Sequence, residues 1–226
     1  MIALSFLEGA VLYLLPLLFV VALWLLTALV IYAAVRSPLD FAFKHDLWRK
    51  FEEKRKLRSG RDRMSFVYVA KLLIGDNCVQ ATLLYRISHF FARHRMRGVA
   101  EMTHAFSRFV THADISPMAR IGPGLLLYHG HGTVVGKGVR AGRRLLICQG
   151  VSVGGAAIGD DVKIWAGAKV IGKLTLGDRC EVGANTVVLA DVPEDAIVFG
   201  VPARLAGSKA RTDDADTAVE KSALPV

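Results

Sequence analysis

A histidine and an aspartate fifteen residues apart are the side chains in this sequence best suited to acid–base chemistry. His129 lies in the run Tyr128-His-Gly-His, and Asp114 precedes it. A neutral imidazole can take a proton from an alcohol as that alcohol attacks a carbonyl carbon. A carboxylate on the other ring nitrogen fixes the tautomer and stabilises the imidazolium that forms. Each residue is also compatible with a structural role, as a hydrogen-bonded histidine or as a cap on the first coil.

Metal chemistry has little support in the sequence. His131 forms a His-x-His pair with His129, but no further ligands accompany the pair at suitable spacing. The three cysteines, Cys78, Cys148 and Cys180, are scattered and show no metal-binding spacing. We therefore expect no metal. We expect the cysteines to be small buried hydrophobic residues in a reducing compartment.

The element that positions these residues is a six-residue repeat from about Ile115 to Val192. Each unit opens with an aliphatic residue, often followed by glycine, and has a small or aliphatic residue four places after the first. A short strand followed by a crowded corner gives this pattern, whereas a helix period does not. About a dozen units at three per turn predict about four coils of a parallel β-helix. After one slip beyond Val153 the opening positions keep strict spacing: Ile158, Ile164, Val170, Leu176, Val182 and Val188.

An apolar run without charge covers residues 9–35. About twenty apolar residues cross a bilayer as a helix. A cleaved signal peptide would have a positive start and a shorter apolar stretch, and a buried helix this uniformly apolar would need a much larger core. We therefore expect a retained transmembrane helix.

Ten lysines and arginines follow this run within residues 36–63, interleaved with acids. Positive loops stay in the cytoplasm. This predicts a single-pass protein of the bacterial inner membrane, with its N-terminus outside and its catalytic domain cytoplasmic. The basic stretch fits a solvated amphipathic helix or, as we favour, contact with anionic lipid heads. We expect no nucleic acid partner, because the lysines and arginines cluster beside the predicted anchor and no nucleic-acid-binding motif accompanies them.

The chain divides into five expected parts. They are a transmembrane anchor at 1–35, a basic juxtamembrane connector at 36–63, a helical region at 64–112, the repeat at 113–206 and a disordered polar tail at 207–226. Apolar residues at helix spacing mark the third part, and we expect its helices to cover the first coil or to make subunit contacts.

Several motifs in fixed order resemble the serine O-acetyltransferase family of hexapeptide-repeat acyltransferases. They are Tyr85-Arg-Ile-Ser-His, Asp114-Ile-Ser-Pro-Met-Ala-Arg-Ile-Gly-Pro-Gly, Tyr128-His-Gly-His-Gly-Thr-Val-Val-Gly, Gln149-Gly-Val-Ser-Val-Gly-Gly, Ala166-Gly-Ala-Lys-Val-Ile-Gly and Gly200-Val-Pro-Ala-Arg. The resemblance implies a mainly β fold, a left-handed parallel β-helix, which is an exception to the usual right-handed crossover. It also implies a homotrimer or a dimer of trimers, with acetyl-CoA as co-substrate lying along the coils between neighbouring chains.

The same resemblance assigns roles to individual residues. His129 matches the general base and Asp114 the carboxylate that orients it. Gly155 matches a backbone N–H donor to the oxyanion of the tetrahedral intermediate. The glycines and alanines are equally compatible with a corner role alone, and Arg204 with a surface position. The cofactor-binding residues implied are Gly155, Ala166, Ala184 and Arg204.

Two departures from the family pattern concern the acceptor. The aspartate that precedes the family's catalytic histidine is Tyr128 here, and the longer loop with an Arg-His pair that grips the serine carboxylate is absent. Trp165 and Asn185 replace family glycines. A pocket without these polar partners should bind a small zwitterion poorly. We assign Tyr128 and Trp165 to substrate binding, because an aromatic face suits a sugar ring.

The sequence therefore predicts a membrane-anchored O-acetyltransferase. It would move acetyl from acetyl-CoA to a sugar hydroxyl of a polysaccharide or lipid-linked glycan precursor, as in the related sugar acetyltransferases of exopolysaccharide biosynthesis. A serine O-acetyltransferase of cysteine biosynthesis is the first alternative. A non-catalytic β-helix scaffold of a membrane-bound polysaccharide synthase is the second.

Overall fold

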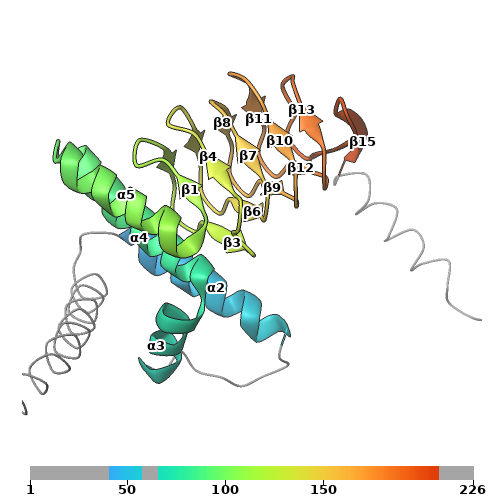
Figure 1. Ribbon diagram of the computed structural model, residues 1–226. Coiled ribbons are helices and arrows are strands. Elements are labelled where there is room, and N and C mark those ends of the chain that lie inside the picture. The colour runs from blue at the N-terminus through green and yellow to red at the C-terminus, as the bar shows by residue number, and fades with distance from the viewer. Residues whose placement is uncertain (1–40, 58–65, 209–226) are drawn as a thin grey trace, which may run out of the picture. The chain divides into compact units, whose positions relative to one another are not determined.

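The computed structural model describes residues 41–57 and 66–208 (Figure 1). The predicted anchor at 1–35, the ends of the connector and the tail beyond residue 208 lie outside the described residues, so the division into five parts stays a prediction. Four described helices come first: α2 (Phe41–Leu57), α3 (Phe66–Gly75), α4 (Asn77–Arg93) and α5 (Arg97–Thr111). Short strands follow and stack into a solenoid (Figure 1).

Three sheets form the sides of this solenoid. Sheet A contains β1 (Asp114–Ile115), β4 (Val134–Val135), β7 (Ser152–Val153), β10 (Lys169–Val170) and β13 (Val187–Val188). Sheet B contains β2 (Arg120–Ile121), β5 (Arg140–Ala141), β8 (Ala157–Ile158) and β11 (Thr175–Leu176). Sheet C contains β3 (Leu126–Tyr128), β6 (Leu146–Cys148), β9 (Lys163–Ile164), β12 (Glu181–Val182), β14 (Ala196–Phe199) and β15 (Arg204–Ser208). The strands pair in parallel, except that β15 closes the stack antiparallel to β14.

The opening residue of each repeat points into the solenoid. Ile164, Val170, Leu176 and Val182 are each 0% exposed, and the fifth places of the repeat are buried with them. Complete burial of such a side chain contributes about 1.5–3 kcal/mol, so the inward column supplies most of the cohesion between coils. The predicted parallel β-solenoid of hexapeptide repeats is therefore confirmed. Its left hand remains implied by the family resemblance.

The crowding expected after the opening residue is present. A Cβ added at Gly122 would lie 2.5 Å from the carbonyl oxygen of Gly142 in the next coil, and one at Gly136 would lie 2.5 Å from the oxygen of Gly154. Both neighbours are backbone atoms, which cannot swing away as a side chain could. Glycine at these places allows the coils to stack closely.

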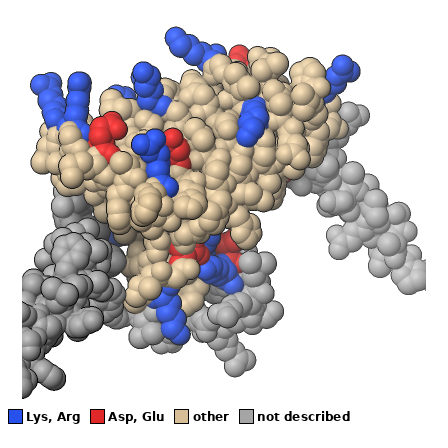
Figure 2. Space-filling view, viewed as in Figure 1, with Lys and Arg blue, Asp and Glu red and all other residues tan. Residues whose placement is uncertain are grey.

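Along the corner that joins sheet B to sheet C, exposed arginines pair with acids of the next coil. Arg143 binds Asp160 at 3.2 Å and Arg144 binds Asp161 at 2.6 Å. In the space-filling view, Lys and Arg side chains stand at intervals over the solenoid, with acids beside some of them (Figure 2). Exposed pairs of this kind add little stability, and they mark this corner as a solvated one.

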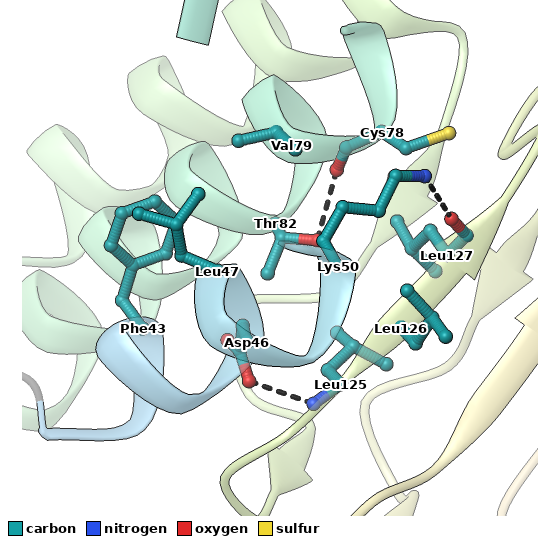
Figure 3. A pocket seen from close by; sticks show the side chains of 10 residues that line it. All are labelled: Phe43, Asp46, Leu47, Lys50, Cys78, Val79, Thr82, Leu125, Leu126 and Leu127. Carbon is teal, nitrogen blue, oxygen red and sulfur yellow. Dashed lines mark hydrogen bonds between the residues drawn. The ribbon is translucent and has the colours of Figure 1, made fainter. Parts of the chain in front are cut away.

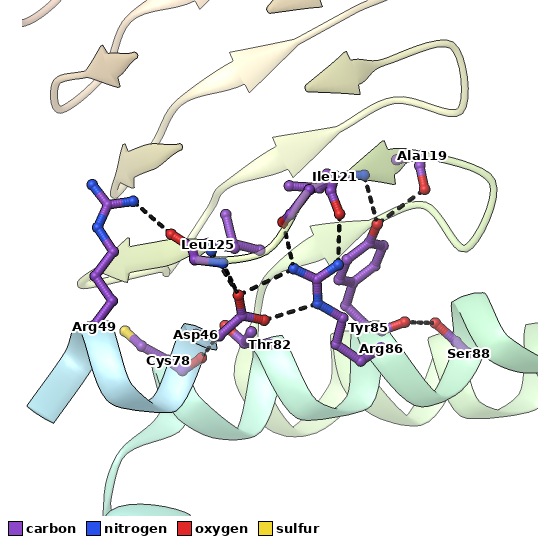
Figure 4. A network of polar contacts seen from close by, with 12 residues as sticks. Asp46, Arg49, Cys78, Thr82, Tyr85, Arg86, Ser88, Ala119, Ile121 and Leu125 are labelled. Atoms are coloured by element: carbon purple, nitrogen blue, oxygen red, sulfur yellow. Dashed lines mark hydrogen bonds and ion pairs between the residues drawn. The ribbon is translucent and has the colours of Figure 1, made fainter. Parts of the chain in front are cut away.

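Helices α2 and α4 dock on the first coil through a buried ion pair. Arg86 of α4 donates to both carboxylate oxygens of Asp46 in α2, at 2.8 and 3.1 Å (Figure 4). The same guanidinium donates to the carbonyl oxygens of Ile121 and Gly122, while Asp46 accepts from the backbone N–H of Leu125. Burial raises the pKa of the Asp46 carboxyl, and Arg86 and the backbone donors offset part of that effect.

The neighbouring Tyr85 is also used for docking. Its hydroxyl donates to the carbonyl oxygen of Ala119 and accepts from the N–H of Ile121 (Figure 4). The Tyr-Arg motif that resembles the family's helical stretch therefore joins helix α4 to the first coil, as we expected of these helices.

Two basic residues of α2 bind the solenoid. Arg49 donates to the carbonyl oxygens of Gly124 and Leu145, and Lys50 donates to that of Leu127. The lipid contact expected of the basic stretch gains no support from these two residues, because their charged groups bind backbone carbonyls of the solenoid. No helix among residues 41–57 and 66–208 is long and apolar enough to cross a membrane. The segment predicted to span lies outside this range.

Candidate active site

His129 lies on an enlarged corner of the solenoid. Strand β3 begins at Leu126 and β4 at Val134, eight residues on, whereas the next coil needs six residues from Leu146 to Ser152. The two extra residues fall in the corner that joins sheet C to sheet A. His129 adopts a φ of +52° and its side chain is exposed. Positive φ is uncommon outside glycine, but histidine is among the residues that tolerate it. The insertion therefore holds a histidine side chain out at the edge of sheet A.

Asp114 begins β1 at the same edge. Its register partner is Val134, and its N–H donates to the carbonyl oxygen of Thr133 at 2.8 Å, so it lies next to the strand that the His129 corner leads into. The Asp114 side chain is 40% exposed. Among the described residues no hydrogen bond joins it to His129, and its proposed orienting role stays a prediction.

The carboxylate of Asp114 is instead held by helix α5. His104 Nε2 lies 2.8 Å from Oδ1, and Arg108 Nη1 lies 3.8 Å from Oδ2. His104 and Arg108 are four residues apart, which places them on one face of the helix. The sequence analysis missed both, and the only available signal was this spacing, because nothing in the sequence indicates how α5 is turned toward β1.

Tyr128 faces α2. Its hydroxyl donates to Glu53, and the Lys50 ammonium lies 5.5 Å from the ring centroid. Burial and the Glu53 carboxylate raise the pKa of the Tyr128 phenol. These contacts hold helix α2 against β3, so the aromatic face expected to receive a sugar already has a partner within the chain.

The residues assigned to the cofactor lie along other parts of the solenoid. Ala166 packs beside Cys148 on the outside of sheet C, and Ala184 follows one coil later. Trp165, which is 37% exposed, directs Nε1 toward Glu181 at 3.4 Å. Arg204 begins β15 at the far end of the stack and is exposed.

Gly155 lies in the corner that joins sheet A to sheet B, after β7. His129 lies in the corner at the other edge of sheet A. One chain therefore does not bring the predicted oxyanion donor and the predicted base together.

A second histidine pair lies beside the enlarged corner. The rings of His112 and His131 have centroids 5.9 Å apart, and the Asn77 amide contacts His131 Nε2 at 2.9 Å. In the part of the chain that the structure describes, no three residues among His, Cys, Asp and Glu gather as they would around a metal ion.

Comparison with known proteins identifies the family. A family model described as bacterial transferase hexapeptide (six repeats) matches residues 155–190. The serine acetyltransferase of Helicobacter pylori is 36% identical over 135 residues, which cover 56% of this chain and 79% of that protein. That of Synechococcus elongatus is also 36% identical, and the match spans 56% of this chain but only 55% of its own length. This chain belongs to the serine acetyltransferase family.

Solved structures agree. The serine acetyltransferase of Neisseria gonorrhoeae in complex with serine superimposes with a TM-score of 0.66 at 28% identity, covering 78% of this chain and 72% of that one. A serine acetyltransferase in complex with CoA gives 0.67 at 28% identity, covering 76% and 72%. Family membership confirms the expected class, an acyltransferase with acetyl-CoA as co-substrate.

Two expectations are corrected by these findings. The sugar acceptor of an exopolysaccharide pathway is wrong at the level of the family, because the similar proteins are serine acetyltransferases. The inner-membrane localisation is corrected on the same ground, because the similar proteins are serine acetyltransferases. The aromatic residues Tyr128 and Trp165 lose the reason for which they were assigned to the substrate.

Proposed function

We propose that this protein transfers the acetyl group of acetyl-CoA to the hydroxyl of serine. The observation that carries the proposal is the enlarged corner, which presents His129 at the edge of sheet A in a chain 36% identical to serine acetyltransferases. An exposed imidazole at a fixed backbone position suits a general base that must reach a diffusible substrate.

In the proposed reaction, His129 accepts the hydroxyl proton as the serine oxygen bonds to the thioester carbonyl carbon. The C–S bond then breaks, and the imidazolium returns its proton to the departing CoA thiolate. Asp114, at the same edge, would hold the imidazole in the required tautomer. No covalent enzyme intermediate is needed.

The oxyanion donor would come from a neighbouring chain. Gly155 follows a strand of sheet A and His129 precedes one, so the two residues lie at opposite ends of the strands of that sheet. They can act together only when the His129 end of one chain faces the Gly155 end of another. This arrangement favours a homotrimer, in which the Gly155 N–H of one chain meets the His129 corner of the next. Ala166 and Ala184 would leave room for pantetheine along the coils, and Arg204 would meet a CoA phosphate.

The serine carboxylate needs a cation, and the family's Arg-His pair is absent from this sequence. Among the described residues Arg108 is the one lysine or arginine that pairs with Asp114, through a loose 3.8 Å contact, and its side chain is 53% exposed. Its guanidinium suits a bidentate carboxylate contact. We assign it that role. Arg108→Ala is expected to raise the KM for serine while the KM for acetyl-CoA stays unchanged.

The test is CoA release by the full chain given acetyl-CoA and L-serine, compared with His129→Ala. Release that requires serine and falls by about 10²–10⁴-fold in His129→Ala supports the proposal. The matched control is His94→Ala, because His94 is an exposed histidine at the C-terminus of α4 and contacts Phe90 of its own helix. Binding of acetyl-CoA without serine-dependent release would contradict serine as the acceptor. If the folded protein did not bind acetyl-CoA, the proposed acetyltransferase activity would be contradicted.

A further inference from the structure

The enlarged corner is anchored from outside the solenoid by the first turn of helix α4. The N–H of Gly130, the residue that follows His129, donates to Sγ of Cys78 at 3.2 Å. The Asn77 amide contacts Nε2 of His131 at 2.9 Å. Two adjacent residues of the helix therefore hold the two residues that follow His129, one through its backbone and one through its side chain.

The corner needs these contacts because it departs from the repeat. Gly130 is buried, and a buried N–H without an acceptor is destabilising. Sulfur is a weak acceptor, but Cys78 is only 5% exposed, so water does not compete with it. Cys78 is therefore placed to fix the peptide that joins His129 to Gly130.

The first turn of α4 is itself held firmly. Asp76 caps the helix by accepting from the N–H groups of Cys78 and Val79, and it binds Lys54 of α2 at 2.7 Å. Lys50 lies 3.7 Å from the same carboxylate and donates to the carbonyl oxygen of Leu127. The close view shows the Lys50 ammonium reaching Leu127 beside the Cys78 sulfur (Figure 3). The anchor is thus continuous from α2 through α4 to the corner.

We propose that Asn77 and Cys78 are positioning residues for His129. The inference rests on the proposed function, since it assumes that His129 is the base. Neither residue touches the reacting atoms. They hold the two residues that follow His129, Cys78 through the Gly130 N–H and Asn77 through the His131 ring, so that the imidazole of His129 meets the substrate hydroxyl at the distance that proton transfer requires.

The experiment measures kcat and both KM values for Cys78→Ala, Cys78→Ser and Asn77→Ala. A displacement of about 1 Å can reduce catalysis about a hundredfold. We therefore expect Cys78→Ala to lower kcat about ten- to hundredfold, with the KM for acetyl-CoA unchanged. Cys78→Ser should restore part of the rate, because its hydroxyl accepts from the Gly130 N–H. Asn77→Ala should lower kcat in the same manner.

Cys180→Ala is the matched control. It removes the same sulfur from a position that is 0% exposed inside the solenoid, away from the corner. It should lower the melting temperature and leave kcat unchanged. Wild-type kcat in Cys78→Ala, or an equal loss of kcat in Cys180→Ala, would overturn the proposal. If Cys78→Ala does not fold, Asn77→Ala decides alone, and a wild-type kcat there overturns it.

Amide hydrogen exchange separates this proposal from the proposed function. The Gly130 amide should exchange faster in Cys78→Ala and as in the wild type in Cys180→Ala, whichever acceptor the enzyme uses. Faster exchange in a protein that does not acetylate serine would refute the proposed function and retain the anchored corner. Full activity in His129→Ala would refute both the role of His129 as general base and the role of Asn77 and Cys78 in positioning it.

Discussion

At the scale of single residues, the notable contact is the one between His104 and Asp114. The family resemblance pairs Asp114 with the proposed base His129, but the structure shows its Oδ1 bound to a different histidine, whose side chain is only 12% exposed. One oxygen of the carboxylate is thereby fixed. The other, Oδ2, faces Arg108 at 3.8 Å and is the oxygen that would accept from His129 in the proposed reaction.

We predict that His104→Ala lowers kcat about tenfold and leaves the KM for acetyl-CoA unchanged, because Asp114 loses the donor that fixes its orientation. His104→Gln, whose amide can donate to the same oxygen, should recover most of the rate. Steady-state kinetics of the two variants provide the check. Equal losses in both would show that the imidazole itself is needed, and no loss in either would show that Asp114 needs no such support.

The sequence could predict part of this site. His129 and Asp114 stand in motifs that resemble the serine O-acetyltransferase family, and that resemblance is what assigned them a role. His104, Cys78 and Asn77 could not be found this way. They lie on helices, and the turn of a helix against the solenoid depends on packing between segments far apart in sequence, such as Arg86 against Asp46.

At the scale of elements, the start of α4 depends on the charge of Asp76. Burial would raise the pKa of this carboxyl. The hydrogen bond from Lys54 and the charges of Lys50 and Lys54 outweigh burial, so the pKa lies below its ordinary 3.8. A carboxylate with a lowered pKa stabilises the fold above its unfolded pKa, and that contribution is lost as the pH falls through the folded value.

Asp76→Asn should therefore lower the free energy of unfolding by about 1 kcal/mol at pH 7, because asparagine keeps the helix cap but loses the two lysines. The difference from the wild type should shrink as the pH falls below about 4. Urea unfolding at pH 7 and pH 3 measures it. A difference that persists at pH 3 would show that the ion pairs are not its source.

Gly122 tests the stacking of coils. Gly122→Ala is expected to lower the free energy of unfolding by about 1–3 kcal/mol, because its Cβ would meet the Gly142 carbonyl oxygen at 2.5 Å. Gly98→Ala in α5 is the matched change, since nothing lies within 4 Å of its Cβ. It should be neutral or stabilising by up to about 1 kcal/mol. The melting temperatures of the two variants provide the check. Similar values would refute the predicted clash at position 122.

Some elements could be predicted from the sequence better than others. The six-residue spacing predicted the strands and their inward side chains. Each opening residue stacks on the opening residues of the coils above and below it, so the same residue type recurs at a fixed spacing in the sequence. The slip after Val153 appears as a coil of seventeen residues, from Ser152 to its partner Lys169. Two charges of the basic stretch have a use that the sequence did not indicate. The charges of this stretch suggested lipid contact, but Arg49 and Lys50 satisfy carbonyl groups at the first coil.

At the scale of the whole molecule, large apolar side chains remain on the surface of the chain. Phe109 and Met102 of α5 are 80% and 74% exposed, and Leu189 and Ile171 beside sheet A are 60% and 54% exposed. Large apolar side chains exposed on one chain are available for contacts with another chain. They agree with a site that needs two chains to bring His129 and Gly155 together.

We predict that sedimentation of the full chain gives an assembly of three chains of 24.6 kDa, or of six for a dimer of trimers. Leu189→Glu should weaken the assembly and lower activity in parallel, because a buried charge at the contact is unfavourable. Ile74→Glu, which adds the same charge at an apolar side chain 62% exposed on α3, is the matched control. An active enzyme of single-chain mass would contradict the shared site.

The order of pairing along the solenoid has a consequence for how the protein is made. In the described parallel ladders every strand finds its partner no more than twenty residues away, as Asp114 does with Val134. Helices α2 and α4, which hold the first coil, precede it in the chain. As the chain leaves the ribosome, its first support is complete before the coils are synthesised, and each coil can settle on the one made just before it. The order of synthesis and the order of assembly are then the same.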